Sequence, residues 1–337
     1  MQLVRQKDEF GSKREDREGG PARRRRGGTG RGAGGGTARK TGRGMSRARA
    51  GAAVLTVAAI ASGCASGADG GAQPAPGQQR LDAPPARALD TYAQKLRVAQ
   101  VARAAAAKRW GLAKTPLTAP RPPARKPKIT TRKGFEVKGQ AQLPPVFTTI
   151  PTKKKIVFLT VDDGAEKDPA LLKMMSELQI PYTAFLSDYL VKEDYGYFKK
   201  MQSRGVVLNN HTLNHRYMPG LSYAGQRREI CGMQDIIQKR YGKRPELFRP
   251  PYGNYNEDTL RAAKSCGIKA VPLWASEAFA DHMEWREWDR DLHPGDIILT
   301  HFRGREDWKG TMPDMVRKVM KTVTDKGYAV ARLEDYL

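Results

Sequence analysis

The first part of the sequence has very few large apolar residues. Residues 1–44 are rich in Arg and Gly, so they have little to bury in a core and are predicted to be disordered. The apolar stretch 50–62 has 13 residues, fewer than the ~20 that cross a hydrocarbon core, which excludes a membrane-spanning helix there.

The basic tracts contain few aromatic residues. The chain has 60 Lys and Arg against 35 Asp and Glu, but residues 152–337 hold 30 against 26. Most of the excess positive charge therefore lies among Gly, Ala and Pro, without the aromatic side chains that stack on bases. This composition argues against specific nucleic-acid binding and suits loose contact with an anionic envelope polymer.

Residues 45–63 have the pattern of a signal peptide. Arg47 and Arg49 precede the short apolar stretch, which ends in small residues before Cys64. The run Ala-Ser-Gly-Cys64 resembles a bacterial lipobox, in which Cys64 is lipidated and becomes the mature N-terminus. We therefore expect an exported protein, anchored as a lipoprotein on the extracellular face of the cell membrane or, without lipidation, secreted. Residues 1–44 are then an extension of the signal or the result of a start assigned too early.

Residues 64–151 are rich in Ala, Pro and Lys and are predicted to link the signal to a folded domain. The Ala-rich segment 86–112 has apolar residues at helical spacing, and a helix there would pack on the domain or contact a partner. The segment 115–145 contains many Pro and basic residues and is predicted to be an extended spacer.

Residues 152–337 are predicted to form the catalytic domain, because strands and helices alternate there. The predicted strands are 156–161, 182–186, 206–210, 247–249, 270–273, 297–301 and 328–332. The predicted helices are 169–178, 197–204, 223–241, 256–266 and 315–326. Alternation of this kind indicates βα units and a parallel sheet. Seven strands in ~185 residues favour an α/β fold with a compact, incomplete barrel over one with an open sheet.

Residues that bind metals or move protons follow several of these strands, and the carboxyl ends of parallel strands open on one face. Asp162 and Asp163 end the first strand, where adjacent side chains point in opposite directions. His211 and His215 are spaced i, i+4, which puts both imidazoles on one side if the backbone turns helically. With Asp163 they offer three N/O ligands and leave a fourth position open, as in catalytic zinc sites.

Histidine is rare in the chain. Three of its five histidines lie at strand ends, the third being His301. His282 and His293 fall in a polar loop and are interpreted as bystanders.

These motifs resemble those of the polysaccharide deacetylase family (carbohydrate esterase family four), whose members include chitin, peptidoglycan and chitooligosaccharide deacetylases and acetylxylan esterases. Four of the family's five motifs occur in order, as Thr160-Val161-Asp162-Asp163-Gly164, His211-Thr212-Leu213-Asn214-His215, Arg249-Pro250-Pro251-Tyr252-Gly253 and Leu299-Thr300-His301. Val161 stands where the family usually has Phe, and Arg216 where Pro usually follows the second His. The family fold is also a distorted, incomplete (β/α) barrel.

The resemblance implies a role for each matched residue. Asp163, His211 and His215 would bind a divalent metal, usually Zn²⁺, with Co²⁺ or Ni²⁺ as alternatives. Asp162 would be the general base that activates the attacking water, and His301 the general acid. The remaining two matched residues support these groups. Arg249 would pair with Asp162 and lower its pKa, and the backbone N–H of Tyr252 would stabilise the oxyanion.

The family's fourth motif, a Trp segment with an Asp, is poorly matched by Trp274-Ala275-Ser276-Glu277. Glu277 would orient His301, meet Arg249 or be a plain loop acid. Trp274 and Trp285 would form a platform for a sugar ring, although a core role is equally open for Trp274.

Cys231 and Cys266 fall on successive predicted helices. In an exported protein they are expected to form a disulfide, or else to be buried as small apolar residues.

The sequence therefore predicts an exported, metal-dependent hydrolase that removes N-acetyl groups from a GlcNAc-type cell-envelope or chitin-like polysaccharide. Three alternatives stay open. They are an O-acetyl esterase acting on acetylxylan or another acetylated glycan, a catalytically silent glycan-binding relative, and a small-molecule C–N hydrolase on the same barrel.

Overall fold

The computed structural model describes residues 86–337. The predictions for 1–44, for the signal peptide 45–63 and for Cys64 lie outside the described residues. The helices are α1 Ala86–Arg109, α2 Pro169–Leu178, α3 Asp188–Val191, α4 Tyr195–Ser203, α5 Tyr223–Tyr241, α6 Glu257–Ser265 and α7 Met312–Asp325. The strands are β1 Val146–Phe147, β2 Ile156–Asp163, β3 Thr183–Leu186, β4 Val207–Asn210, β5 Val271–Pro272, β6 Ser276–Ala278, β7 Met283–Trp285, β8 Ile297–His301 and β9 Ala329–Ala331.

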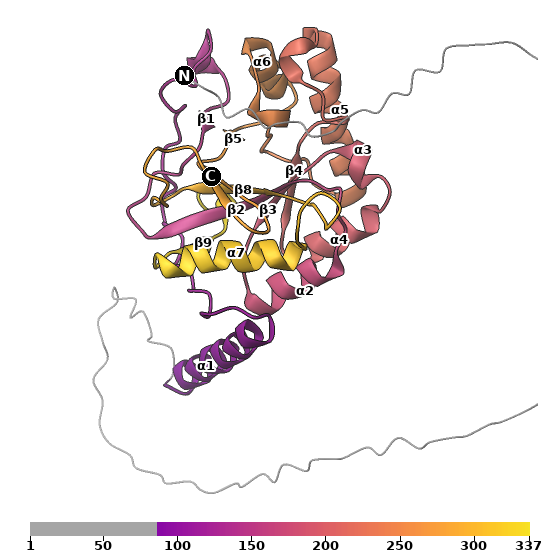
Figure 1. The fold of residues 1–337 in the computed structure, drawn as a ribbon. Coiled ribbons are helices and arrows are strands. Elements are labelled where there is room, and N and C mark those ends of the chain that lie inside the picture. Colours follow the sequence, from indigo (N-terminus) through magenta and orange to yellow (C-terminus); the bar gives the residue numbers. More distant parts are fainter. Residues whose placement is uncertain (1–85) are drawn as a thin grey trace, which may run out of the picture. The chain divides into compact units, whose positions relative to one another are not determined.

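The strands form a distorted barrel (Figure 1). The main sheet has the order β4-β3-β2-β8-β6-β7, β9 also pairs with β2, and only β6 and β7 are antiparallel. A separate parallel pair, β1 and β5, continues the arc. Single bridges join these two sheets, at Asn210↔Phe248, Leu247↔Ala270 and Thr149↔Asp296. The predicted α/β class and incomplete (β/α) barrel are confirmed.

Local sequence signals account for most element boundaries. Every residue of the central strand β2 is buried, as expected of a parallel strand covered on both faces. Helix α2 begins where Asp168 accepts a hydrogen bond from the N–H of Ala170 and Pro169 occupies the first turn. Gly205 follows α4 with φ 88° and Gly267 follows α6 with φ 84°, the left-handed backbone that a helix C-terminus favours in glycine.

The segment before residue 152 is not only a spacer. Strand β1 pairs with β5, and Phe135 and Val146 are buried in the core. Arg132 donates hydrogen bonds to Thr148 at 2.6 Å and to Glu287 at 2.5 Å. The apolar residues among the prolines and lysines are therefore enough to attach this segment to the barrel.

The C-terminal half of α1 packs on the domain. Ala106 and Ala107 are buried, and Arg103 donates through Nε to the carbonyl of Leu178 at the end of α2, at 2.8 Å. The packing alternative for the predicted helix 86–112 is thus observed for this half, whereas Tyr92 and Leu96 of its apolar spacing are exposed. Among the described residues, no helix combines the length and the apolar character that a membrane span requires.

Helices α5 and α6 are joined covalently. Cys231 and Cys266 form a disulfide between them. Of the two alternatives for these cysteines, a disulfide or burial as small apolar residues, the structure shows the disulfide.

Candidate active site and metal centre

Asp163, His211 and His215 converge at the carboxyl ends of β2 and β4, with one ligand atom of each within 4.8 Å of the others. Nε2 of each histidine lies 3.4 Å from Oδ1 of Asp163. That oxygen is buried, and no described residue gives it a hydrogen bond of normal geometry. A buried carboxylate oxygen without a donor is costly unless a cation binds it. One carboxylate oxygen and two imidazole nitrogens therefore fit a divalent metal.

Left-handed backbone, and not a helical turn, brings these ligands together. Thr212 has φ 74° and His215 has φ 51°, so the expected helical geometry between the two histidines is wrong. Side chains stabilise this turn, because Asn210 accepts from the N–H of Thr212 at 2.8 Å and Thr212 accepts from the N–H of His215 at 3.0 Å.

Asp163 has φ 80°, which ends the strand alternation at this residue. As a result both neighbouring carboxylates approach Nε2 of His211, Asp162 at 3.7 Å and Asp163 at 3.4 Å. The expectation that Asp162 and Asp163 point in opposite directions is therefore wrong.

The tautomer of His211 and the charge of His215 suit metal binding. Nδ1 of His211 lies 2.7 Å from the carbonyl oxygen of Arg249, so Nδ1 carries the proton and Nε2 keeps its lone pair toward Asp163. Burial lowers the pKa of His215 to about 3. His215 is therefore a neutral imidazole at neutral pH, the form that coordinates metals.

Arg249 and Asp162 form a fully buried ion pair. Nη1 of Arg249 lies 2.8 Å from Oδ1 of Asp162 and 2.9 Å from Oγ1 of Thr160, and Nε donates to the carbonyl of Pro272. Burial raises the pKa of Asp162, and Arg249 offsets only part of that rise. The predicted pairing of Arg249 with Asp162 and its lowering effect on the pKa are confirmed, but burial makes the net pKa higher than its ordinary value. A raised pKa makes a carboxylate a better proton acceptor.

His301 lies beside Asp162, because the register of β2 and β8 pairs these two residues. Oε1 of Glu277 lies 3.3 Å from Nδ1 of His301, and both side chains are largely buried. Glu277 belongs to β6 and contacts His301, and its charge also acts on Arg249, so of the three roles left open only that of a plain loop acid is wrong. Burial lowers the pKa of His301, but Glu277, together with the charges of Asp163 and Asp162, raises it more, so the net pKa is raised.

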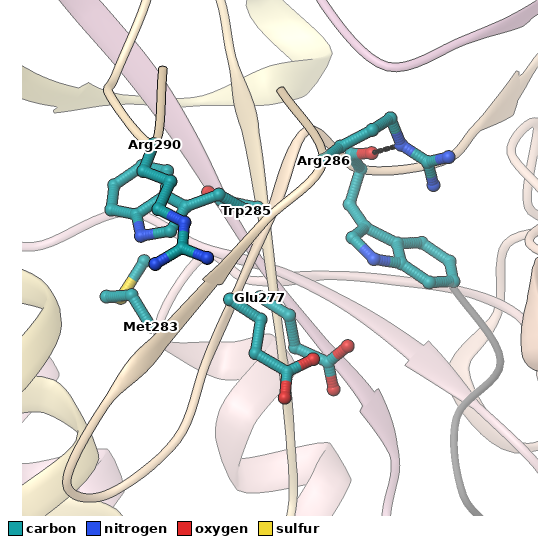
Figure 2. Close-up of a pocket in the computed structure, with 8 residues that line it drawn as sticks. Glu277, Met283, Trp285, Arg286 and Arg290 are labelled. Atoms are coloured by element: carbon teal, nitrogen blue, oxygen red, sulfur yellow. Dashed lines mark hydrogen bonds between the residues drawn. The ribbon is translucent and has the colours of Figure 1, made fainter. Parts of the chain in front are cut away.

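Tyr252 and the two tryptophans stand around this centre. Tyr252 has φ 61°, and its ring centroid is 4.7 Å from that of His215. Trp274 lies against Gly253, where an added Cβ would come within 2.9 Å of the indole, and 5.7 Å from the guanidinium carbon of Arg249. Trp274 thus forms part of the wall of the catalytic centre. Trp274 and Trp285 both line one pocket, in which Figure 2 shows Trp285.

Arg303 is a site residue that the sequence analysis did not single out. Its Nη2 lies 2.8 Å from Oδ2 of Asp163, the oxygen that faces away from the two imidazoles. The available signal was its position, since Arg303 lies two residues beyond His301, the last residue of β8. His282 and His293 pair instead with Asp281 and Asp289 in exposed loops, consistent with their interpretation as bystanders.

The fold and this constellation define a hydrolase with a metal-type donor set at the carboxyl ends of the barrel strands. A family model described as polysaccharide deacetylase matches residues 149–271. The chain is 41% identical over 197 residues to the uncharacterised protein SCO4760 of Streptomyces coelicolor, covering 58% of this chain and 78% of that protein. It is 25% identical over 202 residues to a peptidoglycan-N-acetylglucosamine deacetylase of Bacillus cereus, covering 56% of this chain and 91% of that protein.

A solved structure shows the same fold. The Bc1960 peptidoglycan N-acetylglucosamine deacetylase superposes with a TM-score of 0.50 at 23% identity, covering 58% of this chain and 94% of that one. The chain belongs to the polysaccharide deacetylase family and is an enzyme of that family.

Proposed function

We propose that the protein is a metal-dependent deacetylase that removes N-acetyl groups from a GlcNAc-type polysaccharide, either peptidoglycan or a chitin-like polymer. One observation carries the proposal. Two adjacent carboxylates have different partners, Asp163 with two imidazoles and Asp162 with a buried arginine. Curated relatives support the substrate class, since they are named for activity on peptidoglycan N-acetylglucosamine, peptidoglycan N-acetylmuramic acid and chitooligosaccharide.

The residues divide the reaction among them. A divalent cation held by Asp163, His211 and His215, with Zn²⁺ the first choice, would polarise the acetyl carbonyl and lower the pKa of water. Asp162 accepts the proton of the attacking water, whose oxygen bonds to the acetyl carbon. The backbone N–H of Tyr252 donates to the oxyanion.

His301 completes the reaction. Its protonated ring, supported by Glu277, donates a proton to the sugar nitrogen as the C–N bond breaks. Acetate and a free amino sugar are the products.

Acetate release across matched glycans tests the proposal. We expect release from acetylated chitooligosaccharide or peptidoglycan, and a loss of at least about 10²-fold in Asp162→Asn with the metal content unchanged. Asp258→Asn, an exposed acid on α6, is the control and should behave as wild type. Acetate released only from acetylxylan or aryl acetates would identify an O-acetyl esterase instead.

Metal content provides an independent test. The purified protein should hold about one equivalent of zinc or a similar ion, and Asp163→Ala should lose it because a ligand is missing. A metal-free protein whose activity is indifferent to chelators would contradict the metal-dependent mechanism.

The proposal also places the enzyme outside the cell, on the evidence of the signal-like segment 45–63. Lipidation of Cys64 would hold it at the membrane. Cys64→Ser should then move the protein from the membrane fraction to the medium, and unchanged partitioning would remove the lipoprotein form.

A further inference from the structure

A pocket of about 360 Å³ lies beside the catalytic residues, against the β6–β7 hairpin and the loop that follows it (Figure 2). Glu277 and Trp274 belong both to this pocket and to the catalytic site. Glu277 lines the pocket and contacts His301, while Trp274 lines it and packs against Arg249. A glycan that presents an acetyl group at His301 therefore has this pocket next to it.

Arg286, which lines the pocket, is a partly buried guanidinium without an acidic partner. Its Nε donates to the carbonyl of Trp274 at 2.9 Å, and its charge lies 5.8 Å from the Trp274 ring and 5.5 Å from the Phe135 ring. Within residues 86–337, no carboxylate forms an ion pair with it and its two Nη atoms have no hydrogen bond. Buried arginines are rarely left without a counterion. Burial and then the charge of Arg132 lower the pKa of Arg286, and Glu287 offsets only part of this, so an added negative charge would stabilise the guanidinium.

Arg290 is the second unpaired guanidinium of the pocket. Its backbone is left-handed, with φ 53°, which is uncommon for a residue other than glycine. In Figure 2 its side chain lies beside Trp285, on the side of the pocket toward Glu277. No ion pair or side-chain hydrogen bond involves Arg290 in the part of the chain that the structure describes.

The charged side chains that line the pocket have a net positive charge that one anion would neutralise. Glu277 is engaged by His301, which leaves Glu284 as the other acid against two arginines. The balance is one positive charge, which fits a carboxylate better than a phosphate dianion. A planar guanidinium also matches a carboxylate through paired hydrogen bonds. The faces of Trp274 and Trp285 suit the apolar face of a sugar ring.

We propose that this pocket binds a sugar residue that carries a carboxylate and neighbours the acetylated residue in the polymer. The substrate is then an acidic glycan, with the carboxylate on a lactyl ether, as in muramic acid, or on a uronic acid. This inference rests on the proposed deacetylase function and specifies its substrate.

Two pairs of acetylated oligosaccharides test it, one containing muramic acid and one containing a uronic acid, each compared with its carboxyl-amidated form. Wild-type kcat/KM should be about 10–100-fold higher for the free acid in at least one pair, the range expected of charge-assisted hydrogen bonds. The pair that shows the preference identifies the source of the carboxylate. Arg290→Gln and Arg286→Gln should bring the ratio of acid to amide close to one, whereas Arg261→Gln, an exposed arginine of α6, should leave it as in wild type.

Equal kcat/KM for acid and amide in both pairs would overturn the proposal. So would a preference that survives both substitutions. Arg290 is exposed, so its variant remains informative if Arg286→Gln fails to fold.

Quenching of tryptophan fluorescence by the same oligosaccharides separates this proposal from the deacetylase function. If no substrate releases acetate, tighter binding of an acid than of its amide still supports the pocket, and equal binding refutes it.

Discussion

Replacing Arg249 by Met should be among the most destabilising single changes in this barrel. The guanidinium is fully buried and donates to Asp162, to Thr160 and to the carbonyls of Pro272 and Leu273. Methionine fills similar space but has no donor, so Asp162 keeps a buried carboxylate without a counterion.

The structure sets the size of the effect. Removing one partner of a buried ion pair costs about 3–5 kcal/mol, a large share of the roughly 5–15 kcal/mol by which domains are stable. For a domain of this size the loss corresponds to a fall in Tm of roughly 6–20 °C. Asp162→Asn in the Arg249→Met background should recover part of the loss, because it removes the uncompensated charge.

Urea unfolding of the metal-free protein at neutral pH measures the free energy of unfolding that Arg249→Met loses. Arg261→Met is the matched control, since Arg261 and its partner Asp258 are 54% and 41% exposed and such pairs contribute about 0–1 kcal/mol. If Arg249→Met costs no more than the control, Arg249 and Asp162 do not form the buried pair described above.

Three further changes have defined outcomes. Glu277→Gln should move the alkaline limb of the kcat profile to lower pH, because Glu277 raises the pKa of His301 and a proton donor works only below its pKa; an unmoved limb would contradict this. Removing the Cys231–Cys266 disulfide as a double Ser variant should cost roughly 3–4 kcal/mol in urea unfolding for a separation of 35 residues, and stability insensitive to reductant would count against it. Arg303→Gln should weaken zinc binding about 10–100-fold in a chelator competition, since it frees the second oxygen of the ligating carboxylate; unchanged affinity would show that Arg303 does not position it.

The parts of the fold that local chemistry fixes could be predicted from the sequence. The predicted helix 169–178 coincides with α2, where a capping carboxylate and Pro169 mark the start, and the prediction for 223–241 coincides with α5. The carboxyl ends of the parallel strands could also be placed, because each buried apolar run stops at a polar residue.

Elements that depend on distant partners could not be predicted. β6 and β7 are three residues each, too short to show an alternating pattern, and they form through pairing with each other and with β8. β1 has two residues and exists because β5 lies beside it. The net rise in the pKa of Asp162 could not be predicted for the same reason. The motifs indicate the charge of Arg249, which lowers this pKa, but not the burial by the whole barrel, which raises it more.

Arg249 explains how two adjacent aspartates perform different tasks. The left-handed turn at Asp163 brings both carboxylates toward Nε2 of His211, so geometry alone would let either one serve as a ligand. The guanidinium engages one oxygen of Asp162, while the carbonyl of the same residue holds the ring of His211 in place. Asp162 is thereby committed to an ion pair and Asp163 to the imidazoles, so Arg249 would separate the proposed proton acceptor from the proposed metal ligand.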